Sequence, residues 1–105
     1  MATKKQYNSF SDLLAELKTP VLVDFYAIWC GPCQMMSPVL DTVKKEFQNH
    51  LNVVKIDTDK YPEIASEYNV LALPTLILFK DSQPTKRFEG LSSSEQLISQ
   101  LKTSI

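Results

Sequence analysis

The stretch VLVDFYAIWCGPC, residues 21–33, decides the fold. Its first seven residues are apolar apart from Asp24, a pattern typical of a strand covered on both faces in the middle of an α/β sheet. Beyond the stretch, apolar residues recur at helical spacing between Met36 and Phe47. The sequence therefore predicts a buried strand that passes, through a pair of cysteines, into a long helix.

Helical and strand patterns alternate along the rest of the chain. The spacing of the apolar residues predicts helices over 10–17 and 62–68 and strands over 53–56, 75–79 and 86–89. A turn is expected over 81–84, and a closing helix after Ser92 and Glu95, which have capping-box spacing. Residues 5–7 are expected to add an edge strand. This order predicts a single α/β domain over residues 1–105, with helices on both faces of a mixed sheet.

Composition and charge exclude several classes of protein. The net charge of the 105 residues is −1, and lysines and acids are interspersed, so we expect no nucleic-acid partner and no membrane partner. No window approaches the roughly 18 apolar residues of a membrane helix. Two lysines near the start have no apolar stretch behind them, which argues against a signal peptide. We expect the protein in a bacterial or cyanobacterial cytoplasm, or in the plastid stroma if it is a trimmed mature form.

The two cysteines, Cys30 and Cys33, are three residues apart and have no other cysteine to pair with. At a helix N-terminus, free N–H groups and the helix dipole favour a thiolate, which is the nucleophile of disulfide exchange. Pro32 suits the first helical position, because its missing N–H would have no partner there. We expect Cys30 to be the exposed attacker, and Cys33, one turn into the helix, to be more buried and to resolve the mixed disulfide.

Three other interpretations of the cysteine pair compete with a redox role. A zinc site needs about two more ligands, and the chain offers only His50. A purely structural disulfide would close too short a loop to remove much entropy from the unfolded chain. A chance pair without a role is disfavoured by its position between strand and helix. We therefore expect a redox centre with no metal and no cofactor other than the disulfide itself.

Asp24 interrupts an otherwise apolar strand six residues before Cys30. Burial of its carboxyl group would raise its pKa and let it exchange a proton near neutral pH. The functional interpretation makes Asp24 the base that deprotonates Cys33, through a water molecule. The alternative is an aspartate that is hydrogen-bonded for structure or faces water. Lys55, on the neighbouring strand, either biases the ionisation of Asp24 or is simply solvated.

A third feature, Leu73-Pro74-Thr75, precedes a predicted strand, and the residues alone predict an ordinary trans bond before Pro74. Together with the first stretch, however, it forms a series that resembles the thioredoxin family in order and spacing. The residues that carry this resemblance are those of 23–33, then Lys55-Ile56-Asp57, Leu73-Pro74-Thr75, Leu78-Phe79-Lys80 and Gly90. Residues 53–62 and 88–90 resemble the y-type thioredoxins of chloroplasts and their cyanobacterial relatives.

The resemblance implies a central five-stranded mixed sheet flanked by four helices, with the disulfide at the end of a central strand. It also implies roles by position. Cys30 would attack, Cys33 would resolve and Asp24 would be the buried acid, while Gly31, Pro32 and Lys55 would tune the redox potential. The bond before Pro74 would be cis, and the docking residues would be Trp29, Ala72, Leu73, Pro74 and Gly90, joined by Gly31 and Pro32.

The resemblance further implies a protein-disulfide reductase that acts as a monomer on disulfide-containing target proteins. A separate reductase, either a flavin NADPH-dependent or a ferredoxin-dependent enzyme, would restore its dithiol. The rival interpretations are a disulfide isomerase or oxidant, and a binding subunit that clamps a partner without turnover. Two departures from the family pattern lie near the cysteines. Gln34 replaces the usual cation after the second cysteine and so removes a positive charge near the thiols, and Ile28 adds apolar area beside Trp29, which bears on partner choice.

Overall fold

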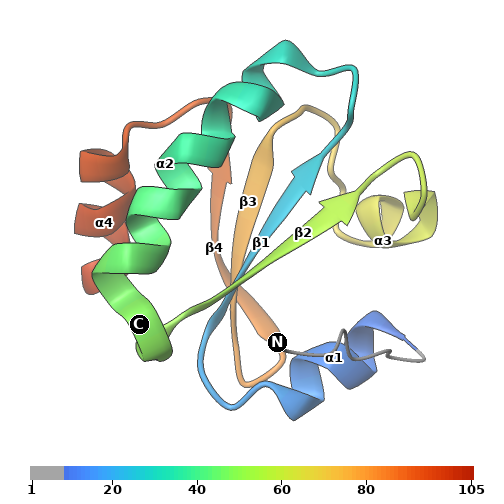
Figure 1. The fold of residues 1–105 in the computed structure, drawn as a ribbon. Helices are drawn as coiled ribbons and strands as arrows, with labels where there is room; N and C mark the ends of the chain where they lie inside the picture. The colour runs from blue at the N-terminus through green and yellow to red at the C-terminus, as the bar shows by residue number, and fades with distance from the viewer. Residues whose placement is uncertain (1–8) are drawn as a thin grey trace, which may run out of the picture.

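The computed structural model describes residues 9–105, in which four strands and four α-helices follow one another in the predicted order (Figure 1). The helices are α1 (Phe10–Glu16), α2 (Gly31–Phe47), α3 (Pro62–Glu67) and α4 (Ser94–Lys102), and a 3₁₀ turn, η1 (Gln48–His50), follows α2. The strands are β1 (Val21–Tyr26), β2 (Asn52–Asp57), β3 (Thr75–Lys80) and β4 (Gln83–Glu89). None of the helices in this part of the chain combines the length and apolar character that a membrane crossing requires.

The strands form one mixed sheet in the order β2-β1-β3-β4. The central strand β1 pairs in parallel with β2 and antiparallel with β3, and β3 pairs antiparallel with β4. The expected five strands are therefore corrected to four among residues 9–105. Three of them, β1 to β3, contain apolar runs, and β4 is the hairpin partner of β3. The additional edge strand expected at residues 5–7 lies outside the described residues.

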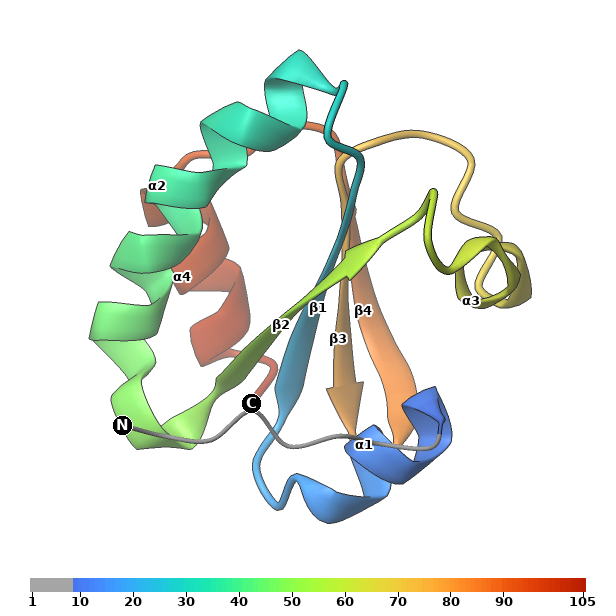
Figure 2. The ribbon, with the colours of Figure 1, turned by 45° about the vertical axis from the view of Figure 1, so that its right-hand side comes forward.

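Helices cover both faces of the sheet (Figures 1 and 2). Alternation along β1 sends Val21, Val23 and Phe25 into a core cluster shared with α1 and α3. Leu22 points the other way, into a cluster shared with α2 and α4. Asp24 has the same parity as Leu22, so its carboxyl group lies under α2 rather than under α1 and α3.

Two local boundaries differ from the sequence prediction. The hairpin turn consists of Asp81 and Ser82 alone, both with positive φ, and β4 already begins at Gln83. Two residues with positive φ make the tight turn whose twist suits a hairpin, and Pro84 is tolerated because β4 is an edge strand. The capping box of α4 lies one residue later than predicted, at Ser93 and Gln96, which bond reciprocally.

Candidate active site

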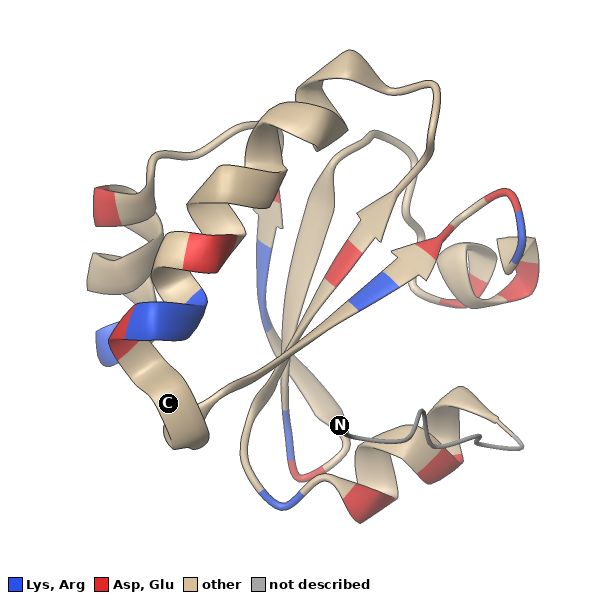
Figure 3. Cartoon of the chain, viewed as in Figure 1, with Lys and Arg blue, Asp and Glu red and all other residues tan. Residues whose placement is uncertain are grey.

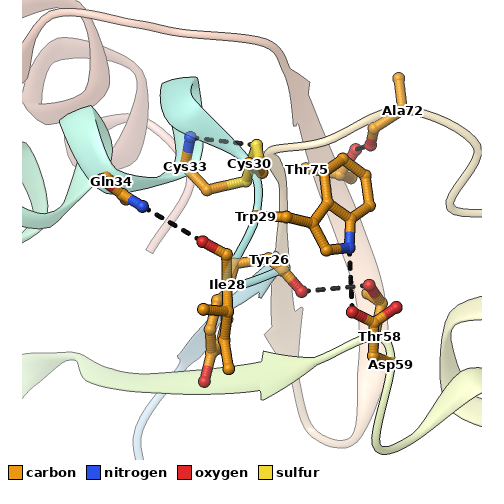
Figure 4. The surroundings of a disulfide bond; sticks show 10 residues. All are labelled: Tyr26, Ile28, Trp29, Cys30, Cys33, Gln34, Thr58, Asp59, Ala72 and Thr75. Atoms are coloured by element: carbon orange, nitrogen blue, oxygen red, sulfur yellow. Dashed lines mark hydrogen bonds between the residues drawn. A yellow bond between two sulfur atoms is a disulfide. The ribbon is translucent and has the colours of Figure 1, made fainter.

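The two cysteines form a disulfide at the start of α2 (Figure 4). Cys30 is the N-cap, Gly31 and Pro32 open the first turn, and the Cα atoms of Cys30 and Cys33 are 5.2 Å apart. The backbone N–H of Cys33 donates to Cys30 Sγ at 3.2 Å. The helix N-terminus thus directs a free amide at the Cys30 sulfur, where it stabilises negative charge.

The two cysteines do not differ in exposure. Each residue is 5% exposed, so the prediction that Cys30 is the exposed member and Cys33 the more buried one is wrong. Both cysteines belong to one buried cluster with Ala27, and Tyr26 and Leu73 pack against that cluster. What distinguishes the cysteines is their surroundings, because each lines a different hollow of the surface.

Cys30 lines an open groove of about 450 Å³. The groove is bordered by Trp29, which is 72% exposed, and by Leu71, which is 93% exposed; its remaining lining is Gly31, Pro32, Thr58, Val70 and Leu73. The indole Nε1 of Trp29 donates to Asp59 Oδ2 at 2.9 Å, which fixes the ring beside the disulfide (Figure 4). Exposed apolar side chains around a reactive sulfur are suited to docking an apolar partner surface.

This end of the molecule carries few charges (Figure 3). Residues 25–40, which include the disulfide, and residues 68–79, which include Leu71 and Leu73, contain no charged side chain. Ile28 and Met35 add apolar surface here, at 70% and 62% exposed. Gln34 donates from Nε2 to the Ile28 carbonyl at 3.1 Å, so it ties down the loop where the family pattern has a free cation.

The segment before β3 lies against the disulfide. The Leu73–Pro74 bond is cis, as the resemblance implies and contrary to the expectation from the residues alone. Thr75 donates from Oγ1 to the Ala72 carbonyl at 2.6 Å, and the N–H of Gly90 donates to the Pro74 carbonyl at 2.9 Å. Gly90 has φ of 81°, which favours glycine. Of the docking residues predicted here, Leu73 lines the groove, whereas Ala72, Pro74 and Gly90 do not.

Cys33 faces a second cavity, of about 190 Å³, on the other side of the disulfide. Asp24 lines this cavity, is 2% exposed, and has an Oδ1 atom without a hydrogen-bond partner among the described residues. Burial raises the pKa of Asp24 to about 6, although the charge of Lys55 lowers it in part. The cavity has room for several water molecules at about 30 Å³ each, so a water can join the carboxyl group to Cys33.

Lys55 reaches the same cavity from β2. It stands opposite Asp24 in the parallel pairing of β1 and β2, so the two side chains share a face of the sheet. Its Nζ donates to Ser37 Oγ at 2.9 Å, and Ser37 also lines the cavity. Lys55 is exposed, as the alternative of a solvated lysine expects, but its charge also lowers the pKa of Asp24.

Several residues of the site were not predicted from the sequence. Ser37 had a usable signal, since it lies four residues after Cys33 on the same helical face. Asp59, Val70 and Leu71 had none, because they lie in loops that only the tertiary fold brings to the disulfide.

Comparison with known proteins agrees with this geometry. The thioredoxin family model matches residues 1–103. A thioredoxin-like protein of Synechocystis sp. is 56% identical over 102 residues, covering 97% of each chain. The chloroplastic thioredoxin Y1 of Arabidopsis thaliana is 52% identical over 104 residues, which are 99% of this chain and 60% of that protein.

A solved structure supports the same assignment. Oxidised mitochondrial thioredoxin 3 of Saccharomyces cerevisiae superposes with a TM-score of 0.81 at 36% sequence identity, covering 90% of this chain and 86% of that one. The redox-capable cysteine pair, the fold and the matched length all point the same way. The chain belongs to the thioredoxin family and is a protein-disulfide oxidoreductase.

Proposed function

We propose that the protein reduces disulfides of target proteins, with the groove as the docking site and each cysteine in one step of the exchange. The supporting observation is that the two cysteines line different hollows, one apolar and open and the other lined by a buried acid. A target disulfide enters the groove, where its backbone lies against Leu73 as a short added strand. The Cys30 thiolate then attacks one target sulfur and the other target sulfur leaves as a thiolate.

The second step uses the cavity around Asp24. Cys33 loses its proton and attacks Cys30, the bond between Cys30 and the target breaks, and the target leaves as a dithiol while the protein is left oxidised. Asp24 accepts the Cys33 proton through water, because a carboxylate with a pKa of about 6 is an effective base near neutral pH. Lys55 keeps a share of Asp24 ionised by its charge.

The first step depends on the helix start. The N–H of Cys33 and the dipole of α2 stabilise the thiolate of Cys30, and Gly31 and Pro32 hold the two sulfurs within bonding distance. Gly31 has open space where a Cβ would stand, so a target can approach its backbone closely. These features support a tuning role for Gly31 and Pro32, without any redox group besides the disulfide.

The protein needs a reductase to restore its dithiol after each turnover. The relatives include chloroplastic thioredoxins and a protein of Synechocystis. On that basis we place the protein in a cyanobacterial cytoplasm or a plastid stroma, with either a ferredoxin-dependent or a flavin NADPH-dependent reductase as electron donor. Incubating the oxidised protein with each reductase in turn, and following free thiols, distinguishes the two donors.

Insulin reduction tests the proposed cycle. With dithiothreitol as electron source, wild type should accelerate insulin reduction, whereas Cys33→Ser should stall as a covalent adduct on the target. Cys30→Ser is the matched control, because it keeps one cysteine at the same helix turn but lacks the proposed attacker. Adducts that form equally well with Cys30→Ser would contradict the assigned order of attack, and an inactive reduced wild type would favour a binding subunit.

A further inference from the structure

One wall of the groove consists of residues 70–74, which connect α3 to β3 and belong to neither a helix nor a strand. We call this segment the docking wall. It carries Val70, Leu71 and Leu73, all three of which line the groove. Val70 and Leu73 pack partly against the core, but the segment has no backbone ladder of its own, so the elements at its two ends also help to position it.

The near end of the docking wall follows directly from the end of α3. Asn69 has φ of 54°, its N–H donates to the Ser66 carbonyl, and the N–H of Val70 donates to the Ala65 carbonyl. These two bonds form a Schellman motif, which sets the direction in which the chain leaves a helix. The helix itself is only six residues long and has no basic residue in its last turn. Support from elsewhere in the fold would add to that of the Schellman motif.

Arg87 on β4 supplies that support. Its Nη1 donates to the Tyr68 carbonyl at 2.6 Å and its Nη2 donates to the Asn69 carbonyl at 2.5 Å. In the antiparallel pairing Arg87 stands opposite Ile77, so it projects from the face of the sheet that α3 covers. The planar guanidinium fits two adjacent carbonyls at once and brings a positive charge to the negative end of the helix.

The residue that directly follows β4 holds the far end of the docking wall. Gly90, three residues beyond Arg87, donates its N–H to the Pro74 carbonyl at 2.9 Å. Arg87 and Gly90 thus hold the wall immediately before Val70 and at Pro74. The contact between Arg87 and the end of α3 could not be predicted from the sequence, because Arg87 lies 14 residues from Leu73 and belongs to no motif or periodic pattern.

We propose that Arg87 is a positioning residue for target docking: its two hydrogen bonds to the end of α3 set the place of Val70 and Leu71 in the groove. The proposal rests on the proposed function, since it assumes that targets dock in this groove. Arg87 touches neither cysteine, and it lies outside both hollows beside the disulfide. Its loss should therefore weaken docking of a protein target and leave the reactivity of Cys30 unchanged.

The test compares two disulfide substrates with the reduced protein. Insulin must dock in the groove, whereas the small disulfide 5,5′-dithiobis(2-nitrobenzoate) needs only access to Cys30. Arg87→Met keeps the length of the side chain and removes every donor. Losing two charge-assisted bonds should raise KM for insulin about three- to tenfold, with kcat within about twofold and the small-disulfide rate unchanged. The KM of Arg87→Lys for insulin should lie between those of wild type and Arg87→Met, because lysine has one donor group in place of the planar guanidinium.

Two matched variants complete the design. Lys86→Met removes the neighbouring cation, which bonds to Gln100 on α4, and Glu89→Gln removes the 3.5 Å ion pair of Arg87 but leaves both carbonyl bonds. Both should keep the wild-type KM. An unchanged KM in folded Arg87→Met, or equal losses with both substrates, overturns the inference. If Arg87→Met fails to fold, an unchanged KM for insulin in Arg87→Lys overturns the inference instead. A wild type without insulin reduction would instead overturn the proposed function.

Discussion

Asp24→Asn should stabilise the oxidised protein increasingly as the pH rises. Burial raises the pKa of Asp24 from its ordinary value of 3.8 to about 6. Between those values the unfolded chain has lost the Asp24 proton and the folded protein has kept it, so stability falls by about 1.36 kcal/mol per pH unit. The proton on Asp24 thus contributes about 3 kcal/mol to the free energy of unfolding. This contribution is fully present below about pH 4 and fully lost above about pH 7. Asparagine, which does not ionise, avoids this loss.

Guanidinium chloride unfolding of the oxidised forms, from pH 3.5 to 8, measures the effect. The free energy of unfolding of Asp24→Asn, relative to wild type, should rise by about 3 kcal/mol across that range. Comparing the change with pH removes any constant effect of a buried amide. Asp41→Asn, on an exposed position of α2, serves as control and should show no comparable slope. A pH-independent difference for Asp24→Asn would refute a buried acid with a raised pKa.

Three further outcomes follow from the geometry. Lys55→Met should raise the pKa of Asp24 further, because it removes the charge that now lowers it, and NMR titration of the Asp24 carboxyl carbon measures this. Ser93→Ala should cost about 1 kcal/mol in unfolding experiments, since it removes the N-cap of α4, whereas the exposed Ser99→Ala should not. Gln34→Lys should make the KM of acidic target proteins fall at low salt, while the wild-type KM should change little between 20 and 200 mM salt (about a threefold change in Debye length).

Features with a local cause could be predicted from the sequence. The apolar run of β1 and the helical period of α2 were confirmed, because each element buries a face that its own residues define. The burial of Asp24 followed from the same run. Its pairing with Lys55 could also be anticipated, since two parallel buried strands bring residues of equal parity to one face.

Features without a local cause could not be predicted in this way. The cis bond before Pro74 followed only from the family likeness, because most X–Pro bonds are trans. The capping box was displaced by one residue, since three serines in a row, at 92–94, all offer a cap and the serines alone do not distinguish between them. The role of Arg87 could not be predicted because its partners are backbone carbonyls, which every residue has.

The division of work between the cysteines also depends on tertiary structure. Helical position alone predicts an exposed Cys30 and a buried Cys33, yet both are covered to the same degree. The disulfide instead separates two environments: an apolar groove bounded by segments from three parts of the chain, and a cavity under α2 that is lined by Asp24 and Lys55. A target in the groove meets Cys30 first, and Cys33 lines the cavity that holds the carboxyl group of Asp24. The direction of the proposed exchange is therefore set by what each sulfur faces rather than by how much of it is exposed.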